Sequence, residues 1–258
     1  MQGYLEADLS EVSNWNIMDV NVRLGPSGIH GELALEKDAL LVEMDRFGIN
    51  TAVVSHFTAE EYDAREGNSA LAGNRNVRLI PAWSALPDSS DVEALARRNP
   101  NVVKLCCASS KHNFSSASWC SGELLEYLQD KSILVLVSRE DLQLGTPTGW
   151  DNLVALLSNF SRLPIVLLDL GYRSDRYLFP LLKRHTNLHF ETSNYAAHRQ
   201  LECYVEAFGS DRALFGSQLP LFTPGAALAV LISARISDEA KLAIAGGNLR
   251  RLLKVNPQ

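Results

Sequence analysis

Two ionisable side chains occur inside or directly after apolar runs of the sequence, where charge is unusual. Lys104 lies within the run Val102-Val103-Lys104-Leu105-Cys106, and His56 follows Val53-Val54-Ser55. A buried ammonium group requires a partner, so we expect Lys104 to pair with Asp169 or with an anion of a ligand. The imidazole of His56 is a candidate general base or ligand-binding group, and a hydrogen bond to the backbone is the alternative.

The chain contains eight short runs of apolar, β-forming residues. Helical periodicity marks the segments between them, as in the stripe Leu40, Leu41, Met44 and Phe47. The runs recur at intervals of roughly 25 to 35 residues, about the length of one strand with its following helix. They cover residues 15–22, 51–55, 77–83, 102–105, 133–138, 164–169, 187–192 and 213–217.

Two of these runs, 133–137 and 165–168, are apolar at every position. A strand that is covered on both faces has this pattern, which indicates parallel pairing with helices outside. Eight such units in 258 residues predict an α/β protein with a single (β/α)8 TIM barrel, forming one domain over residues 1–258. An open, doubly wound parallel sheet is the alternative.

The composition is that of an ordinary globular protein and excludes several function classes. The 30 Asp and Glu residues outnumber the 24 Lys and Arg residues, and no basic cluster occurs, so we expect no nucleic-acid partner. No apolar stretch approaches the ~18–20 residues that span a bilayer, so we expect no membrane association. Because the N-terminus lacks the apolar core of a signal peptide and the four cysteines form no CxxC pair, we predict a cytoplasmic location.

In a (β/α)8 barrel, the residues that end the strands gather at one mouth. Arg139 and Arg173 follow two of the runs, and with Arg23 and Lys104 they would make the mouth electropositive. Surface salt bridges are the alternative for the first two arginines. Trp83 ends the third run, where it would either stack on a planar ligand or plug the barrel.

Three stretches together resemble the metal-dependent amidohydrolases. Their sequences are LLVEMDRFGINTAVVS at 40–55, FGSDRALFGSQLP at 208–220 and IAGGNLRRLL at 244–253. They look like that family's first helix with its second strand, its eighth strand and its closing helix. The similarity is to the branch that contains aminocarboxymuconate-semialdehyde decarboxylase and 2-pyrone-dicarboxylate lactonase. It implies a barrel with its chemistry at the C-terminal ends of the strands.

The resemblance also implies a divalent metal ion, yet the residues at the corresponding positions differ from the family's ligands. The family's first strand carries Asp-x-His-x-His, and this sequence has Asp19-Val20-Asn21-Val22-Arg23. Ser138 and Asp169 stand where the family has the histidines of its fifth and sixth strands. Gln218 stands where the family has the aspartate of its Gly-Ser-Asp motif.

These replacements change what the positions can bind. Asn21 and Gln218 offer weak amide oxygens, Ser138 offers a neutral hydroxyl, and only Asp169 remains a good ligand. Arg23 has no usable lone pair and stays protonated. A unit charge 4 Å from a divalent ion is repelled by roughly 8 kcal/mol at an effective dielectric constant near 20. We therefore predict that the protein holds neither a metal ion nor any other cofactor.

Arg23 is the candidate replacement for the positive charge of the metal. We expect Asp169 to face it as a counter-ion, with Asn21 and Gln218 hydrogen-bonded nearby, because a buried charge needs a partner. Either this cluster only fills a lost site, or Arg23 clamps a carboxylate or phosphate group of a ligand. The residues that we expect to contact such a ligand are Asn21, Trp83, Ser138, Arg139, Arg173 and Gln218.

The sequence leaves open whether the protein is an enzyme. We favour a divergent amidohydrolase-like protein that binds a small anionic molecule with little or no hydrolase activity, or that serves as a scaffold in a homo-oligomer. The alternative is a metal-independent hydrolase, lactonase or decarboxylase, in which Arg23 and Lys104 stabilise negative charge and His56 or Asp169 moves a proton. A relocated metal site is a third possibility, and its ligands would be His56, Cys106, His112 and Asp169.

Overall fold

A curled, mostly parallel sheet forms the centre of the molecule in the computed structural model, which describes residues 12, 14–31, 33–107 and 112–255. The strand order is β2-β1-β3-β4-β5-β6-β7-β8-β9, and only the short β2, Ala34–Leu35, pairs antiparallel, with β1. The parallel strands within the described residues are β1 Ile17–Pro26, β3 Ile49–His56, β4 Leu79–Ala85, β5 Val102–Leu105, β6 Leu134–Ser138, β7 Ile165–Leu168, β8 Leu188–Glu191 and β9 Ala213–Leu214.

The sheet closes on itself between its last strand and β1. The Val20 N–H donates to the carbonyl of Phe215 at 3.0 Å, and the Arg23 N–H donates to that of Leu219 at 2.9 Å. Val22 and Leu219 also form a parallel bridge. The predicted (β/α)8 barrel is therefore confirmed, and the open sheet is excluded because its edge strands would remain unpaired.

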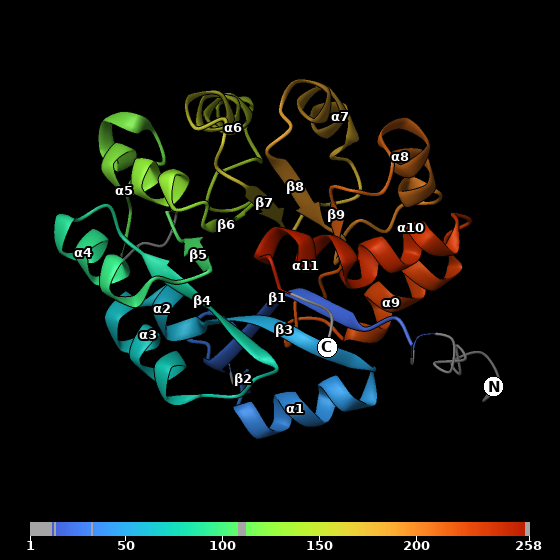
Figure 1. The fold of residues 1–258 in the computed structure, drawn as a ribbon, viewed down its shortest axis with the longest axis horizontal. Coiled ribbons are helices and arrows are strands. Elements are labelled where there is room, and N and C mark those ends of the chain that lie inside the picture. Colours follow the sequence, from blue (N-terminus) through green and yellow to red (C-terminus); the bar gives the residue numbers. More distant parts are fainter. Residues whose placement is uncertain (1–11, 13, 32, 108–111, 256–258) are drawn as a thin grey trace.

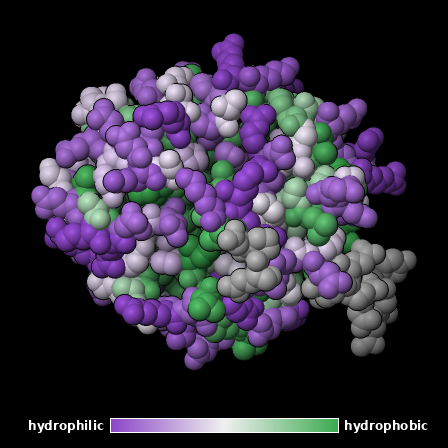
Figure 2. All heavy atoms as spheres, viewed as in Figure 1, coloured by the Kyte–Doolittle hydropathy of each residue, from purple (hydrophilic) through white to green (hydrophobic). Residues whose placement is uncertain are grey.

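Helices surround the strands on the outside, and α11 lies across one end of the barrel (Figure 1). Polar side chains cover most of the face drawn in Figure 2, as expected where the outer sides of helices meet water. The helices are α1 Lys37–Arg46, α2 Phe57–Glu61, α3 Ala64–Gly73, α4 Ser89–Arg98, α5 Ser118–Asp130, α6 Pro147–Asn159, α7 Asp175–Arg184, α8 Gln200–Phe208, α9 Pro224–Ser233, α10 Asp238–Leu242, the π-helix η1 Ala243–Gly247 and α11 Asn248–Leu253.

Each of the eight predicted runs overlaps one strand of the barrel. The ends differ by a few residues, and the last run, 213–217, is a strand only at Ala213–Leu214. Beyond Leu214 the chain changes partners, because the Phe215 N–H donates to the carbonyl of Ile244 at 2.9 Å. This departure allows the segment after β9 to reach β1.

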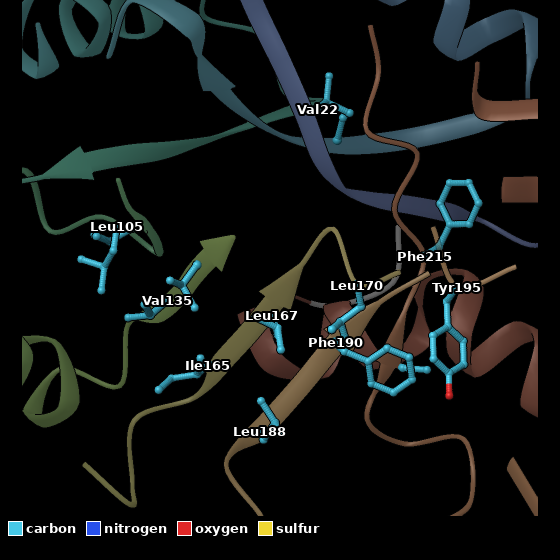
Figure 3. Packing of buried hydrophobic residues seen from close by; sticks show 14 of the residues in the cluster. Val22, Leu105, Val135, Ile165, Leu167, Leu170, Leu188, Phe190, Tyr195 and Phe215 are labelled. Atoms are coloured by element: carbon cyan, nitrogen blue, oxygen red, sulfur yellow. The ribbon is translucent and has the colours of Figure 1, made fainter. Parts of the chain in front are cut away.

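Two apolar layers hold the barrel together because successive side chains of a strand point to opposite faces. The larger layer lies between the sheet and the helices. It includes Leu167, Phe190 and Tyr195, which Figure 3 shows packed together with their neighbours from adjacent strands. The Phe190 and Tyr195 rings are 5.0 Å apart between centroids. This layer fixes the helices on the outside of the barrel.

The smaller layer fills the interior of the barrel. Val102, Leu134 and Val166 contribute to it from neighbouring strands, and Leu249 and Leu253 contribute from α11. All five are buried. The interior below the mouth is thus a packed core, so any ligand must bind above it, at the C-terminal ends of the strands.

A close approach of two helices positions α2 beside the mouth. A Cβ atom added to Gly67 of α3 would lie 2.2 Å from the backbone nitrogen of Ala59 in α2. Only glycine permits this separation without displacement of a backbone. Gly67 therefore determines how near α2, with its acidic residues Glu60 and Glu61, lies to the strands.

We predict that Gly67→Ala destabilises the protein by about 1–3 kcal/mol, the usual cost of overpacking. The matched control is Gly122→Ala in α5, where an added Cβ has no atom within 4 Å. This control is expected to raise stability by about 0.5–1 kcal/mol because alanine favours the helix. Urea unfolding of both variants measures the difference, and equal effects would contradict the proposed contact.

Candidate functional site

An extra residue in β1 turns its polar side chains into the barrel. Asp19 pairs with Ala52 and Val22 pairs with Val54, so β1 advances three residues where β3 advances two. Such a bulge shifts the alternation of side chains by one position. Arg23, beyond the bulge, points into the mouth instead of into the packed layer.

Asp19 stabilises this irregular segment from within the barrel wall. Its Oδ1 accepts the backbone N–H groups of Asn21 at 3.0 Å and Ser217 at 3.1 Å, and its side chain is fully buried. Burial raises the pKa of Asp19 to about 6, although hydrogen bonds from Ser217 and Asn21 oppose the rise. We assign Asp19 a positioning role, since it joins β1 to the segment after β9.

Arg23 forms two ion pairs in the mouth. Its Nε lies 3.1 Å from Glu60 Oε2, and its Nη2 lies 3.5 Å from Asp169 Oδ2. Burial disfavours the charge, but these two carboxylates outweigh burial and raise the pKa of Arg23 further above its usual range. The expected Arg23–Asp169 pair is present, and the shorter contact is with Glu60, which no sequence motif indicated.

Glu60 bridges the two buried cations of the site. Its Oε1 accepts from Lys104 Nζ at 2.6 Å and from the Ser55 hydroxyl. Burial alone would raise the pKa of Glu60, yet the charges of Lys104 and Arg23 prevail and lower it to about 2. Lys104 therefore has Glu60 as its partner, and our expectation of Asp169 was wrong. Glu60 lies on α2, far from Lys104 in the sequence. It reaches Lys104 of β5 only because the helices pack so that α2 lies beside the barrel mouth.

Asp169 and Glu191 form the other half of the cluster. The Asn21 amide donates to Asp169 Oδ1 at 2.8 Å and to Glu191 Oε1 at 3.3 Å, and the Asp169 N–H donates to Glu191 Oε1 at 2.7 Å. Burial and the neighbouring Asp169 charge raise the pKa of Glu191. Glu191 is a charged residue within the buried strand β8. A charge inside an apolar strand is the pattern that indicated Lys104, and the same pattern could have indicated Glu191.

A cavity of about 630 Å³ opens above this cluster. Its ionisable lining, besides His30 and Cys106, consists of Arg23 together with five acidic residues. The mouth is therefore not electropositive, contrary to our expectation. The acidic lining residues are Glu60, Glu61, Glu140, Asp141 and Asp169.

Ser138 and Gln218, which we expect to contact a ligand, also line the cavity. The Ser138 hydroxyl donates to Asp141 Oδ2 at 2.6 Å. Gln218 Oε1 accepts from the Asn194 amide at 2.8 Å, so it does not bond to the Arg23 cluster as we expected. Both side chains are largely buried and present polar atoms at the strand ends.

Two other predicted site residues lie away from this cavity. His56 Nδ1 accepts the backbone N–H of Thr58 at 3.2 Å and so caps α2. Its ring occupies the space beside Gly25, where an added Cβ would be 2.3 Å from His56 Cε1. Trp83 points outward from β4, with the Arg98 guanidinium 4.1 Å from its ring centroid. It therefore neither plugs the barrel nor faces the mouth.

Arg139 and Arg173 line a separate cavity beside the mouth. Both side chains are exposed, and the Arg173 guanidinium lies 5.3 Å from the centroid of the Tyr172 ring. The surface salt bridges considered as their alternative role are also absent among the described residues. The electropositive surface predicted for the mouth is therefore displaced to its rim.

Comparison with known proteins supports the resemblance seen in the sequence. A family model described as amidohydrolase matches residues 32–255. The structure superposes on 2,6-dihydroxybenzoate decarboxylase complexed with 2,6-dihydroxybenzoate with a TM-score of 0.75 and 16% identity, covering 93% of this chain and 99% of that one. The 2,6-dihydroxybenzoate decarboxylase from Rhizobium gives 0.73 and 17%, with 93% and 98% covered.

A dihydroxybenzoic acid decarboxylase from Polaromonas sp. JS666, with bound manganese and the inhibitor 2-nitroresorcinol, is also similar. It superposes with a TM-score of 0.73 and 14% identity, covering 94% of this chain and 98% of that one. At such identities the likeness shows a shared fold. None of the curated proteins matches this chain. In the described part of the chain, no helix is both long and apolar enough to cross a bilayer.

The residues at the mouth do not fit the divalent metal ion that the resemblance implies. The described residues contain no group of three or more His, Cys, Asp or Glu arranged to hold a metal ion. Arg23 and Lys104 bring two positive charges to the cluster, and Glu60 and Asp169 are engaged with them. Such charges oppose a divalent cation at this place.

The relocated metal site is not assembled either. His56 Nδ1 accepts from Thr58, and His112 Nε2 lies 2.8 Å from the carbonyl of Ala59, so both imidazoles are engaged with α2. Burial raises the pKa of Cys106 well above its usual value, which disfavours the thiolate that a metal requires. Within the described residues, the four candidate ligands do not converge.

We predict that Glu60→Gln lowers the free energy of unfolding by about 3–5 kcal/mol at pH 7, because Arg23 and Lys104 lose their shared counter-ion. A carboxylate with a lowered pKa stabilises the fold above its unfolded pKa and ceases to do so as the pH falls. The difference between wild type and variant should therefore shrink from pH 4.5 towards pH 2.

Urea unfolding at a series of pH values measures this difference. Glu206→Gln is the control, since Glu206 is exposed on α8 and should contribute little at any pH. A pH-independent loss in the Glu60 variant would show that the contribution of Glu60 does not come from its charge.

Proposed function

The chain belongs to the amidohydrolase family, and from that premise we propose that it binds a small carboxylate at the barrel mouth and has lost metal-assisted hydrolysis. In this proposal the buried network of Arg23, Lys104, Glu60 and Asp169 replaces the metal-binding centre of the family. Arg23 is the principal ligand-binding residue. Ser138 hydrogen-bonds to the ligand beside it.

The observation that carries this proposal is an unsatisfied donor on Arg23. Its Nε and Nη2 bond to Glu60 and Asp169, whereas its buried Nη1 has no acceptor among the described residues. A buried N–H group without a partner is costly, and a charged one more so. A small adjustment of the side chain towards the cavity allows a ligand oxygen to accept from it, as a carboxylate does from guanidinium groups.

The charges of the site limit the ligand to one negative charge. Arg23 and Lys104 are balanced by Glu60 and Asp169, so the core of the cluster is close to neutral. The remaining acidic lining repels a ligand with several charges. A monocarboxylate with additional hydroxyl groups meets both conditions, because hydroxyl groups donate to the acidic side chains while the carboxylate accepts from Arg23.

Decarboxylation is a second candidate function, favoured by the carboxyl groups of Asp169 and Glu191. When the bond to the carboxyl carbon breaks, carbon dioxide leaves and the electron pair stays on the substrate carbon, which must then accept a proton. The raised pKa of Glu191 keeps a proton available near Asp169, which lines the cavity. The structural neighbours named as dihydroxybenzoate decarboxylases suggest an aromatic hydroxy acid as the substrate class.

We predict that the purified protein contains zinc, iron or manganese at well below one ion per chain, because Arg23 and Lys104 oppose a divalent cation. Elemental analysis after dialysis against each metal measures this. The manganese-containing decarboxylase from Polaromonas sp. JS666 is the positive control. One tightly held ion per chain would overturn the proposed loss of metal.

We predict that 2,6-dihydroxybenzoate binds saturably in calorimetric titration and that Arg23→Lys weakens this binding at least about tenfold. The lysine keeps a positive charge between Glu60 and Asp169 but loses the planar set of donors. Arg97→Lys on the exposed face of α4 is the control and should bind as wild type does.

Two results decide between the alternatives. Unchanged affinity in the Arg23→Lys variant, with folding verified by thermal unfolding, would exclude Arg23 as the carboxylate-binding group. Release of carbon dioxide from the bound acid would favour the decarboxylase over a binding protein.

A further inference from the structure

We propose that the rim cavity beside the mouth is a second binding site, selective for a small molecule that carries a dianionic group such as a phosphate. This rim cavity lies between the segments that follow β6 and β7, and its volume is about 390 Å³, within the usual range of ligand pockets. It is distinct from the mouth and independent of the function proposed there.

The charge of the rim cavity is opposite to that of the mouth. Two arginines, Arg139 and Arg173, line it, and no acidic residue does. Neither arginine side chain forms a hydrogen bond or ion pair with the described residues, so both guanidinium groups retain their full set of donors. In a chain of net charge −6, these two guanidinium groups make the rim cavity locally positive.

The backbone around the rim cavity holds Arg139 in place. The Arg139 N–H donates to the carbonyl of Leu168 at 3.1 Å, and the Arg139 carbonyl accepts from Leu144 at 3.0 Å. A Cβ added to Gly171 would lie 3.9 Å from Arg139 Nη1, so the guanidinium extends over the backbone that follows β7. An anion between Arg139 and Arg173 can thus accept from two planar donor groups.

Two helices begin at this cavity and strengthen its attraction for an anion. Thr146 lines it and caps α6 by accepting the Gly149 N–H at 3.2 Å, and Ser174 lines it directly before α7. The N-terminal ends of helices carry partial positive charge. Asp175, in the first turn of α7, does not line the cavity and is occupied with the Tyr195 hydroxyl at 2.5 Å.

Aromatic rings form one wall of the rim cavity. The rings of Trp150 and Tyr177 stack at 4.6 Å between centroids with an angle of 5° between their planes, and Tyr172 lies beside Arg173. A flat ring on the ligand finds an apolar surface here, while its charged group meets the arginines. We therefore expect an aromatic phosphate ester to bind better than inorganic phosphate.

Calorimetric titration with phenyl phosphate tests the proposal. Saturable binding to the wild type is expected, with affinity reduced at least about tenfold in both Arg139→Gln and Arg173→Gln, since each variant removes one charged donor group. Both side chains are exposed and form no hydrogen bond or ion pair with the described residues, so the variants should fold normally. Arg97→Gln, also exposed, is the control and should bind as wild type does.

Inorganic phosphate should displace phenyl phosphate at a higher concentration, because the anion is the group recognised. Absence of saturable binding, equal binding in all variants, or failure of phosphate to compete would overturn the proposal. The Arg23→Lys variant, which tests the mouth, should bind phenyl phosphate normally. The two sites are therefore tested independently, and failure of one leaves the other standing.

Discussion

A buried carboxylate between two buried cations is the interaction on which the arrangement of this protein's site depends. Glu60 joins Arg23 of β1 to Lys104 of β5, two strands on different sides of the barrel mouth. Without it, two positive charges would face each other in a region largely closed to water, which costs several kcal/mol. The lowered pKa of Glu60 expresses the same balance, because its ionised form is held by both cations.

This network alters what the amidohydrolase barrel can do at its mouth. A divalent ion polarises a substrate and activates water, whereas fixed cations can stabilise negative charge but do not generate a strong nucleophile. By the resemblance seen in the sequence, Asn21, Arg23, Ser138, Asp169 and Gln218 stand at the positions that the family uses for metal binding. Under the function that we propose, the site recognises an oxygen-bearing ligand, and Glu191 near Asp169 can take part in transfer of a proton.

The mouth and the rim cavity carry opposite charges, although both are lined by residues at the ends of β6 and β7. Ser138 lines the mouth, and the next residue along the chain, Arg139, lines the rim cavity. Because successive side chains at the end of β6 point to opposite sides, Ser138 faces the mouth and Arg139 faces the rim cavity. The site that we propose for a singly charged ligand therefore lies next to the one that we propose for a dianion.

The sequence by itself determined the barrel, because runs that are apolar at every position, repeated with helical segments between them, can be buried only as parallel strands covered by helices. It also indicated Lys104 as a buried charge and Arg23 with Asp169 as a pair. The tertiary structure alone decided that Glu60 is the common partner, since the approach of α2 depends on the contact between Gly67 and Ala59. It also decided which residues face the mouth. The outward direction of Trp83 and the inward direction of Arg23 depend on strand register and on one bulge, and neither is encoded in residue type.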